Sequence, residues 1–135
     1  MNRPIVLAAV GALLGAAGFA SAAQPIVSGA LQTGDDTAGA CYVRNVGRAP
    51  ITVRVALLEN FSAGFIAPDV DTCDSEAPLG PGRTCAVLAN TLPADVTFEC
   101  SATAVSGSTK NLRASAELRF VDRDGLVFAA AQDLR

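Results

Sequence analysis

The chain has no histidine and no tryptophan, and it contains a single lysine, Lys110. Without histidine it lacks the commonest general base and the commonest metal-binding side chain. With one lysine and no run of basic residues, it offers no cationic segment of the kind that binds nucleic-acid phosphates or an anionic membrane surface. The formal net charge of −3 points the same way. We therefore expect no nucleic-acid partner and no enzymatic activity.

Long apolar runs are also scarce, and the one that is present lies at the N terminus. Arg3 precedes a nearly continuous stretch of Ile, Val, Leu, Ala and Gly over residues 5–19, and the small residues of 20–23 follow it. This order is typical of a secretory signal peptide. The run is shorter than the ~20 residues that a membrane-spanning helix needs. We predict that 1–23 is a signal-peptide helix, cleaved after Ala22 or Ala23, with no membrane span afterwards.

Four cysteines form an even set in a chain that we expect to be exported. In an oxidising compartment such cysteines are usually disulfide-bonded. The first cysteine is Cys41, too far from the signal for a lipoprotein anchor, and no C-x-x-C pair is present. Three connectivities are possible, of which we favour Cys41–Cys100, joining two inward-facing strand positions, and Cys73–Cys85, closing one loop. The predicted location is periplasmic or extracellular.

The remaining chain, 24–135, has the length of one domain. Short stretches that alternate apolar and polar residues are separated by Gly, Pro, Asp and Asn, a pattern typical of an antiparallel β-sandwich. The clearest is 112–120, in which Leu112 to Phe120 alternate between an inward and an outward face. The predicted strands are 26–33, 39–46, 51–57, 65–66, 84–92, 96–104, 112–120 and 126–131. We therefore predict a single all-β domain.

Two sets of turn residues add a resemblance to this picture. The chain contains Asn45-x-Gly47-x-x-Pro50 before an alternating strand, then Cys73, Leu79-Gly80-Pro81-Gly82, Cys85 and Pro93. Over 45–93 it resembles the immunoglobulin-like repeat of the ASPM, SPD-2 and Hydin (ASH) type, as found in bacterial exported proteins. The resemblance implies an immunoglobulin-like antiparallel β-sandwich of about seven or eight strands. It also supports the Cys73–Cys85 pair and implies a non-catalytic binding or scaffolding module.

Carboxylates are the remaining candidates for chemistry. Asp69, Asp71 and Asp74 gather in the segment 68–82, and hard cations such as Ca²⁺ prefer several carboxylate oxygens. The EF-hand spacing is absent, so we interpret them as a solvated acidic loop. Glu99 and Glu117 are predicted on outward strand faces, where neighbouring strands could bring them together for acid–base work; surface solubility is the simpler interpretation. We predict no catalytic residue, no metal site and no cofactor.

These observations favour an exported bacterial protein that acts as a non-catalytic binding or structural module in the periplasm or at the cell surface. Its expected partner is another protein or a component of the cell envelope, contacted through the Asp/Pro/Gly-rich segment 69–82. The alternative hypothesis is a small β-domain that binds a ligand or Ca²⁺ through carboxylates, with or without enzymatic activity. A calcium-dependent rise in melting temperature would favour the second hypothesis.

Overall fold

The computed structural model of the chain describes residues 24–60, 64–75, 77–122 and 125–134. The predicted signal peptide, 1–23, lies outside the described residues, as do Arg123 and Asp124 in the predicted turn at 122–125. Within the described ranges, no helix combines the length and the apolar character that crossing a membrane requires.

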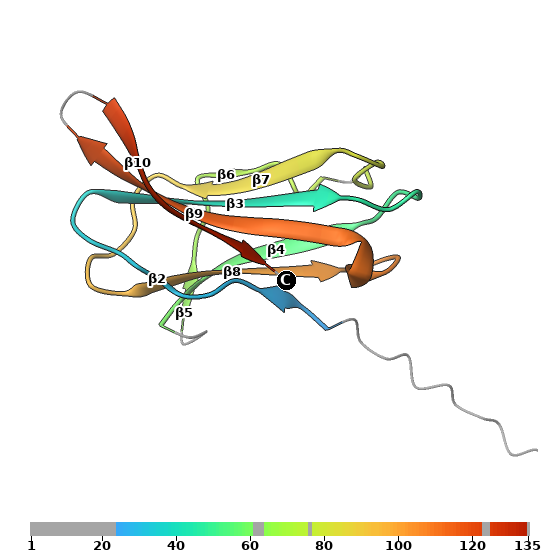
Figure 1. The fold of residues 1–135 in the computed structure, drawn as a ribbon, viewed down its shortest axis with the longest axis horizontal. Helices are drawn as coiled ribbons and strands as arrows, with labels where there is room; N and C mark the ends of the chain where they lie inside the picture. The colour runs from blue at the N-terminus through green and yellow to red at the C-terminus, as the bar shows by residue number, and fades with distance from the viewer. Residues whose placement is uncertain (1–23, 61–63, 76, 123–124, 135) are drawn as a thin grey trace, which may run out of the picture.

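Ten strands and one short 3-10 helix make up the described chain, in two five-stranded sheets (Figure 1). The elements are β1 (Ile26–Val27), β2 (Leu31–Gln32), β3 (Thr37–Asn45), β4 (Val53–Glu59), β5 (Gly64–Ile66), β6 (Val70–Asp71), β7 (Thr84–Ala89), β8 (Thr97–Ala104), η1 (Thr109–Asn111), β9 (Leu112–Asp122) and β10 (Gly125–Leu134). The first sheet has the order β1-β8-β4-β5, and β2 also pairs with β8; the second has the order β10-β9-β3-β7-β6.

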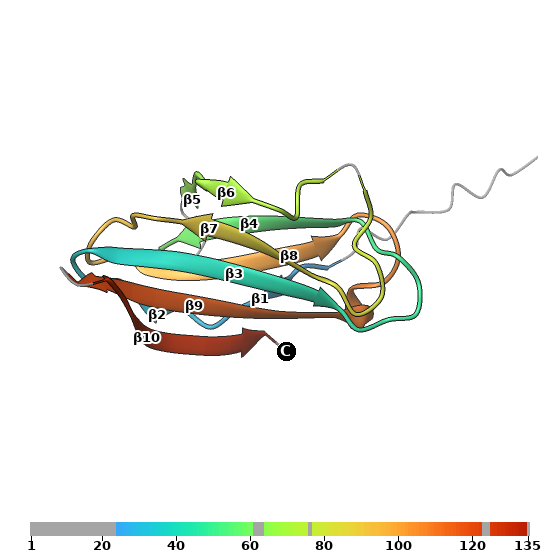
Figure 2. The same ribbon diagram turned by 90° about the horizontal axis from the view of Figure 1, so that it is seen from above.

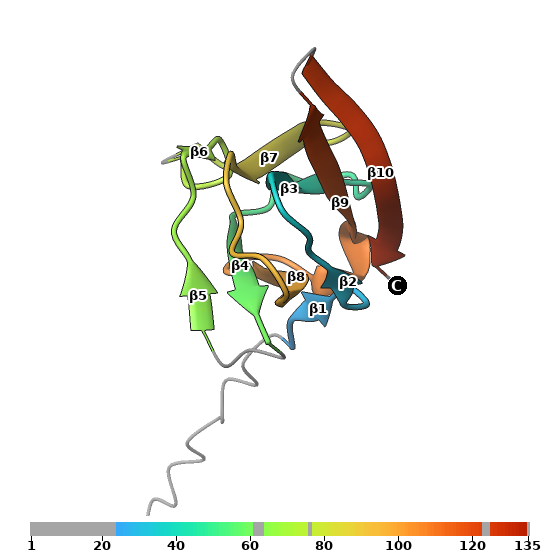
Figure 3. The ribbon, with the colours of Figure 1, turned by 90° about the vertical axis from the view of Figure 1, so that its left-hand side faces the viewer.

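All strand pairs are antiparallel, and the two sheets lie face to face, as the end-on view in Figure 3 shows. The prediction of an all-β antiparallel sandwich is confirmed. The central pairs, β3 with β7 and β4 with β8, match the pairs B–E and C–F of an immunoglobulin domain. The outer strands differ: β1 and β2 pair with β8, and β9 pairs with β3, so the first and last strands of that arrangement have exchanged sheets.

The core fills the space between the sheets, and period-two alternation selects its members. On β3, Cys41, Val43 and Asn45 are buried, and on β9 the buried positions run from Leu112 to Leu118 at every second residue. The other fully buried side chains from the facing sheet include Phe98, Cys100 and Leu57. Apart from Phe98, the core is built of aliphatic residues, cysteines and small alanines.

Both disulfides clamp this core. Cys41 on β3 is paired with Cys100 on β8, with Cα atoms 5.9 Å apart, so this bridge joins the two sheets. Cys73, just after β6, is paired with Cys85 on β7 at a Cα separation of 5.0 Å, so this bridge lies within the second sheet. These are the two pairs that the sequence favours, and both separations suit a disulfide. Such pairs indicate a location outside the cytoplasm.

Three differences from the predicted strands have physical causes. The predicted strand 26–33 is split into β1 and β2, because Ser28 turns its hydroxyl back to the Cys100 N–H at 2.9 Å. The predicted loop 68–82 contains β6. Phe120 was predicted to face the core but is 42% exposed, because it pairs with Thr37, the first residue of β3, where β9 begins to extend beyond its neighbour (Figure 1).

The Asn45 side chain ties three segments together at one end of the sandwich. Its Nδ2 donates to the carbonyl oxygens of Ala49 and Leu79, both at 2.8 Å, and its Oδ1 accepts from the N–H of Gly47 at 2.8 Å. The side chain is fully buried, so each of these bonds replaces contact with water. The N-x-G motif and the Leu79 segment, read separately in the sequence, therefore form one turn assembly.

Candidate functional site

The segment predicted as a long contact loop, 69–82, lies against the sandwich at three points. β6 pairs with Val87 and Leu88 of β7. Cys73 is bonded to Cys85. Leu79 exchanges two backbone hydrogen bonds with Ile51, at 2.8 and 3.0 Å. The segment is therefore held along one side of the molecule, beside β5, and Figure 2 shows β5 and β6 together there, with β10 on the opposite side.

The aspartates considered for Ca²⁺ hold the backbone of this segment. Oδ2 of Asp69 accepts from the N–H of Asn90 at 2.6 Å, and Oδ1 of Asp71 accepts from the N–H groups of Cys73 and Asp74 at 2.7 and 2.9 Å. Asp69, Asp71 and Asp74 are all exposed. In the described ranges, no three His, Cys, Asp or Glu residues are grouped so that they could hold a metal ion. Asp69 and Asp71 thus serve as turn acceptors.

The two strand glutamates are not neighbours, which corrects the expectation that adjacent strands could bring them together. Glu99 lies on β8 of the first sheet and Glu117 on β9 of the second, so the sandwich separates their outward faces. Glu99 is also 6% exposed instead of being a free surface residue, and it is in register with the buried Leu58 of β4. Glu117 is bound by Arg119, whose Nε lies 2.8 Å from its Oε1. No acid–base pair is formed by these residues.

One edge of the first sheet is left open between two covered stretches. β5 pairs with β4 only at Leu57, Leu58 and Glu59. Further along the same edge, Leu79 covers Ile51. Between these points, within the described residues, the β4 backbone has no strand beside it.

The hydrogen-bonding pattern shows which groups face this gap. Successive residues of an antiparallel ladder direct their N–H and C=O groups alternately to the two sides. The N–H of Asn60 donates to Thr97 and the carbonyl of Thr52 accepts from Val105, so even-numbered residues bond to β8. The N–H and C=O groups of Val53 and Val55 therefore face away from β8, toward the open edge. This is the backbone template to which an added strand binds.

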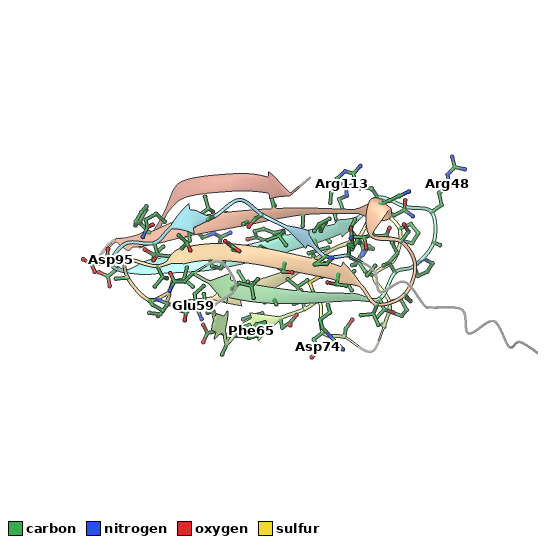
Figure 4. The ribbon with its side chains drawn as sticks, turned by 90° about the horizontal axis from the view of Figure 1, so that it is seen from below. Arg48, Glu59, Phe65, Asp74, Asp95 and Arg113 are labelled. Atoms are coloured by element: carbon green, nitrogen blue, oxygen red, sulfur yellow. A yellow bond between two sulfur atoms is a disulfide. The ribbon has the colours of Figure 1, made fainter. Side chains whose placement is uncertain are left out.

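An apolar hollow of about 350 Å³ adjoins this edge. Most of its border is apolar: Val55 and Leu57 of β4, Ile66 of β5, Val87 of the facing sheet, and Ala67 and Pro68; Asp71 also borders it. Phe65, in the same wall, is 80% exposed, and Figure 4 shows it pointing outward from the sheet. The open edge and this hollow together make a site for an extended apolar segment.

Part of this site was predicted from the sequence, through two stretches of the chain. The sequence predicted a strand beginning at Phe65 and a contact segment starting at Asp69, and both border the site. It did not predict the open edge, because strand lengths on either side of a gap are decided by which distant segments pair. A period-two pattern reports which face a residue occupies and carries no information about whether a neighbour covers its backbone.

Comparison of the chain with protein-family models, with curated proteins and with solved structures found no match.

Proposed function

We propose that this chain is an exported bacterial β-sandwich module without catalytic activity, which binds an extended segment of a partner protein along the β4–β5 edge, in the periplasm or at the cell surface. The observation that carries the proposal is the open β4 edge at Val53 and Val55 beside an apolar hollow and the exposed Phe65. Main-chain hydrogen bonds would supply affinity, and the hollow would select an apolar side chain.

Two further observations support the location and the class. Both cysteine pairs lie at disulfide distance, as in proteins that fold in an oxidising compartment. The N-terminal apolar run with its small-residue end is typical of an export signal. The resemblance of 45–93 to the ASH repeat also favours a binding module, since that family carries no catalytic residues.

Binding at the edge is tested by photo-cross-linking in living cells. A photo-reactive phenylalanine analogue placed at Phe65 is expected to capture one dominant partner protein. The same analogue at Phe120, which is 42% exposed and lies on β9 of the second sheet, is the positional control. A cross-link that forms equally well from both positions would show nonspecific contact.

The mechanism is tested by Val55→Pro combined with the analogue at Phe65. Proline removes the N–H that faces the open edge, and that N–H takes no part in the β4–β8 ladder, so the sheet is expected to persist. We expect the cross-link yield to fall at least tenfold with Val55→Pro and to remain with Val55→Thr, which keeps the N–H. If both variants cross-link like the parent, the partner does not add a strand, and the proposed function is wrong.

A further inference from the structure

The fold gathers cationic side chains that are scattered in the sequence. Three segments, 44–54, 80–84 and 104–115, meet at one end of the sandwich through the bonds of Asn45 to Arg83 and of Val46 to Asn111, 3.0 and 2.8 Å long. Together these segments contain no Asp or Glu. Their exposed basic residues are Arg44, Arg48, Arg54, Arg83, Lys110 and Arg113. A chain of net charge −3 thus has one strongly cationic end, where Figure 4 shows Arg48 and Arg113.

The most unusual feature of this end is a pair of arginines directly opposite each other. Arg44 of β3 is in register with Arg113 of β9, and both side chains are on the outward face of the second sheet. Like charges in directly opposed positions destabilise a sheet. Among the side chains that the structure describes, which exclude those of 121–135, no carboxylate lies within ion-pair distance of either guanidinium. A local conflict of this kind is typical of a functional site.

The two arginines border a hollow of about 230 Å³ on the sheet face. Tyr42, Thr84 and Ser115 also line it, so the residues around the hollow carry two guanidinium groups and three hydroxyl groups. One N–H edge of the Arg113 guanidinium is fixed, because its Nη1 donates to the carbonyls of Lys110 and Leu112 at 3.1 and 2.7 Å. Its other donors remain for a ligand. Guanidinium groups bind carboxylates, sulfates and phosphates through paired hydrogen bonds.

Arg119 extends this surface along β9. Its Nη2 donates to the Tyr42 hydroxyl, and its guanidinium lies 6.0 Å from the centre of the Tyr42 ring. Since the Tyr42 oxygen accepts that bond, its own O–H proton is available to the hollow. The hydrogen bond to Glu117 raises the pKa of Arg119, which stays cationic at physiological pH.

We propose that this surface binds a linear acidic polysaccharide, with sugar carboxylates on Arg44 and Arg113 and a sugar ring on Tyr42. The cationic groups and the single aromatic ring follow one another along the strands, from Arg119 to Arg48, which fits a polymer better than an isolated ion. A flat sheet face with one ring among hydroxyl groups suits the face and the hydroxyls of a sugar. This proposal stands apart from binding at the β4–β5 edge, which lies on the other sheet.

Tyr42 makes the test simple, because it is the only tyrosine and the chain has no tryptophan. Titration of the mature protein with polygalacturonate at low ionic strength is expected to change the Tyr42 fluorescence saturably. The affinity should fall as salt rises, because counterions are released on binding. Neutral dextran should produce no change. No saturable change with polygalacturonate, confirmed by calorimetry, would overturn the proposal.

Matched variants separate a defined site from general charge attraction. Arg44→Gln and Arg113→Gln should each weaken polygalacturonate binding about tenfold. Arg54→Gln, which removes the same charge at the same end but on the first sheet, should weaken it less than twofold. The melting temperature should hold or rise in Arg44→Gln, since a like-charge contact is removed. Equal losses in all three variants would leave only nonspecific attraction, which contradicts the proposal.

The same protein can be tested for two other ligands of this surface, duplex DNA and a second copy of the chain. Duplex DNA that binds more tightly than polygalacturonate, at equal charge concentration and salt, would reassign the surface to nucleic acid. Sedimentation of the protein alone at low salt tests a second copy, whose acidic end carries Asp35, Asp36 and Asp95. Concentration-dependent self-association that disappears in both Arg113→Gln and Asp95→Asn would assign the surface to that contact instead. Either result would overturn the polysaccharide proposal.

Discussion

At the scale of single residues, the buried polar side chain of Asn45 links separate turns of the chain. It is fully buried and satisfies one N–H and two carbonyl groups in the turn 45–49 and at Leu79. The same turn brings Arg44, Arg48 and Arg83 to one end of the molecule. A change at Asn45 should therefore affect stability and the shape of the cationic end together.

We expect Asn45→Ala to lower the free energy of unfolding by about 2–4 kcal/mol, because three buried backbone groups lose their partner. Urea denaturation measured by circular dichroism is the appropriate assay. Asn90→Ala is the control, since Asn90 is exposed and its side chain forms no hydrogen bond within the described structure. A cost below about 1 kcal/mol for Asn45→Ala would mean that water replaces the amide.

Gly39 has a different constraint, which is space in the core. A Cβ at this inward position of β3 would lie 2.9 Å from side-chain atoms of Leu92 and Phe98. Overpacking of this kind costs about 1–3 kcal/mol, so Gly39→Ala should lower the melting temperature. Gly80→Ala, where the nearest atom is Cγ of Arg83 at 3.5 Å, should leave it nearly unchanged. Equal melting temperatures for the two variants would show that Leu92 and Phe98 can move aside.

At the scale of elements, the two disulfides differ in what they connect. Cys41–Cys100 joins the sheets across 59 residues of sequence, whereas Cys73–Cys85 closes 12 residues within one sheet. The entropic stabilisation of a bridge grows with the length of the loop it closes. The inter-sheet bridge should therefore matter more to the fold, and the short bridge more to the segment beside β5.

Removal of each bridge by paired alanines tests this difference. Cys41→Ala with Cys100→Ala should cost about 4 kcal/mol from the loop alone, and Cys73→Ala with Cys85→Ala about 3 kcal/mol. Both pairs are buried, so each pair of substitutions also leaves a small cavity. Guanidinium denaturation under non-reducing conditions gives the two values. A larger loss from the short bridge would indicate that the segment 69–82, which contains β6, contributes more to stability than its length suggests.

The elements also show what a single sequence can and cannot predict. Alternation located β3, β4, β8 and β9 to within a few residues, because each strand has one buried face and one outer face. Alternation did not reveal β6, because a strand of two residues is too short to show an alternating pattern. The exchange of the first and last strands between sheets could not be predicted either, because alternation specifies a face and not a neighbour.

At the scale of the whole molecule, charge is distributed unevenly. The end with Arg48 and Arg113 is cationic, whereas Asp95 and Glu59 lie at the opposite end (Figure 4). The sequence contains no run of basic residues, and no cationic surface was predicted from it. The six basic residues come from three segments far apart in the chain, so only the fold assembles them. Such a separation of charge would orient the molecule as it approaches an anionic polymer.

Export and oxidation together predict the form of the mature protein. Mass spectrometry of the protein purified from its native compartment should give a chain that begins at Ala23 or Gln24. Its intact mass should be lower than that of the reduced chain by four hydrogens, the ones that the cysteine thiols lose when two disulfides form. Digestion without reduction should yield one peptide pair through Cys41 and Cys100 and another through Cys73 and Cys85. Free thiols or an intact leader would contradict the proposed location and require a different search for partners.

The inter-sheet bridge has a mechanical consequence if the protein is tethered at both ends in an envelope structure. Tension applied to the termini would pass from Cys41 to Cys100 through the covalent bond, so the chain between them could not lengthen. Only 24–40 and 101–134 would be drawn out, each residue adding at most ~3.5 Å. The β4–β5 edge, which lies inside the closed loop, would bear no load. Its partner could therefore stay bound while the flanking strands extend.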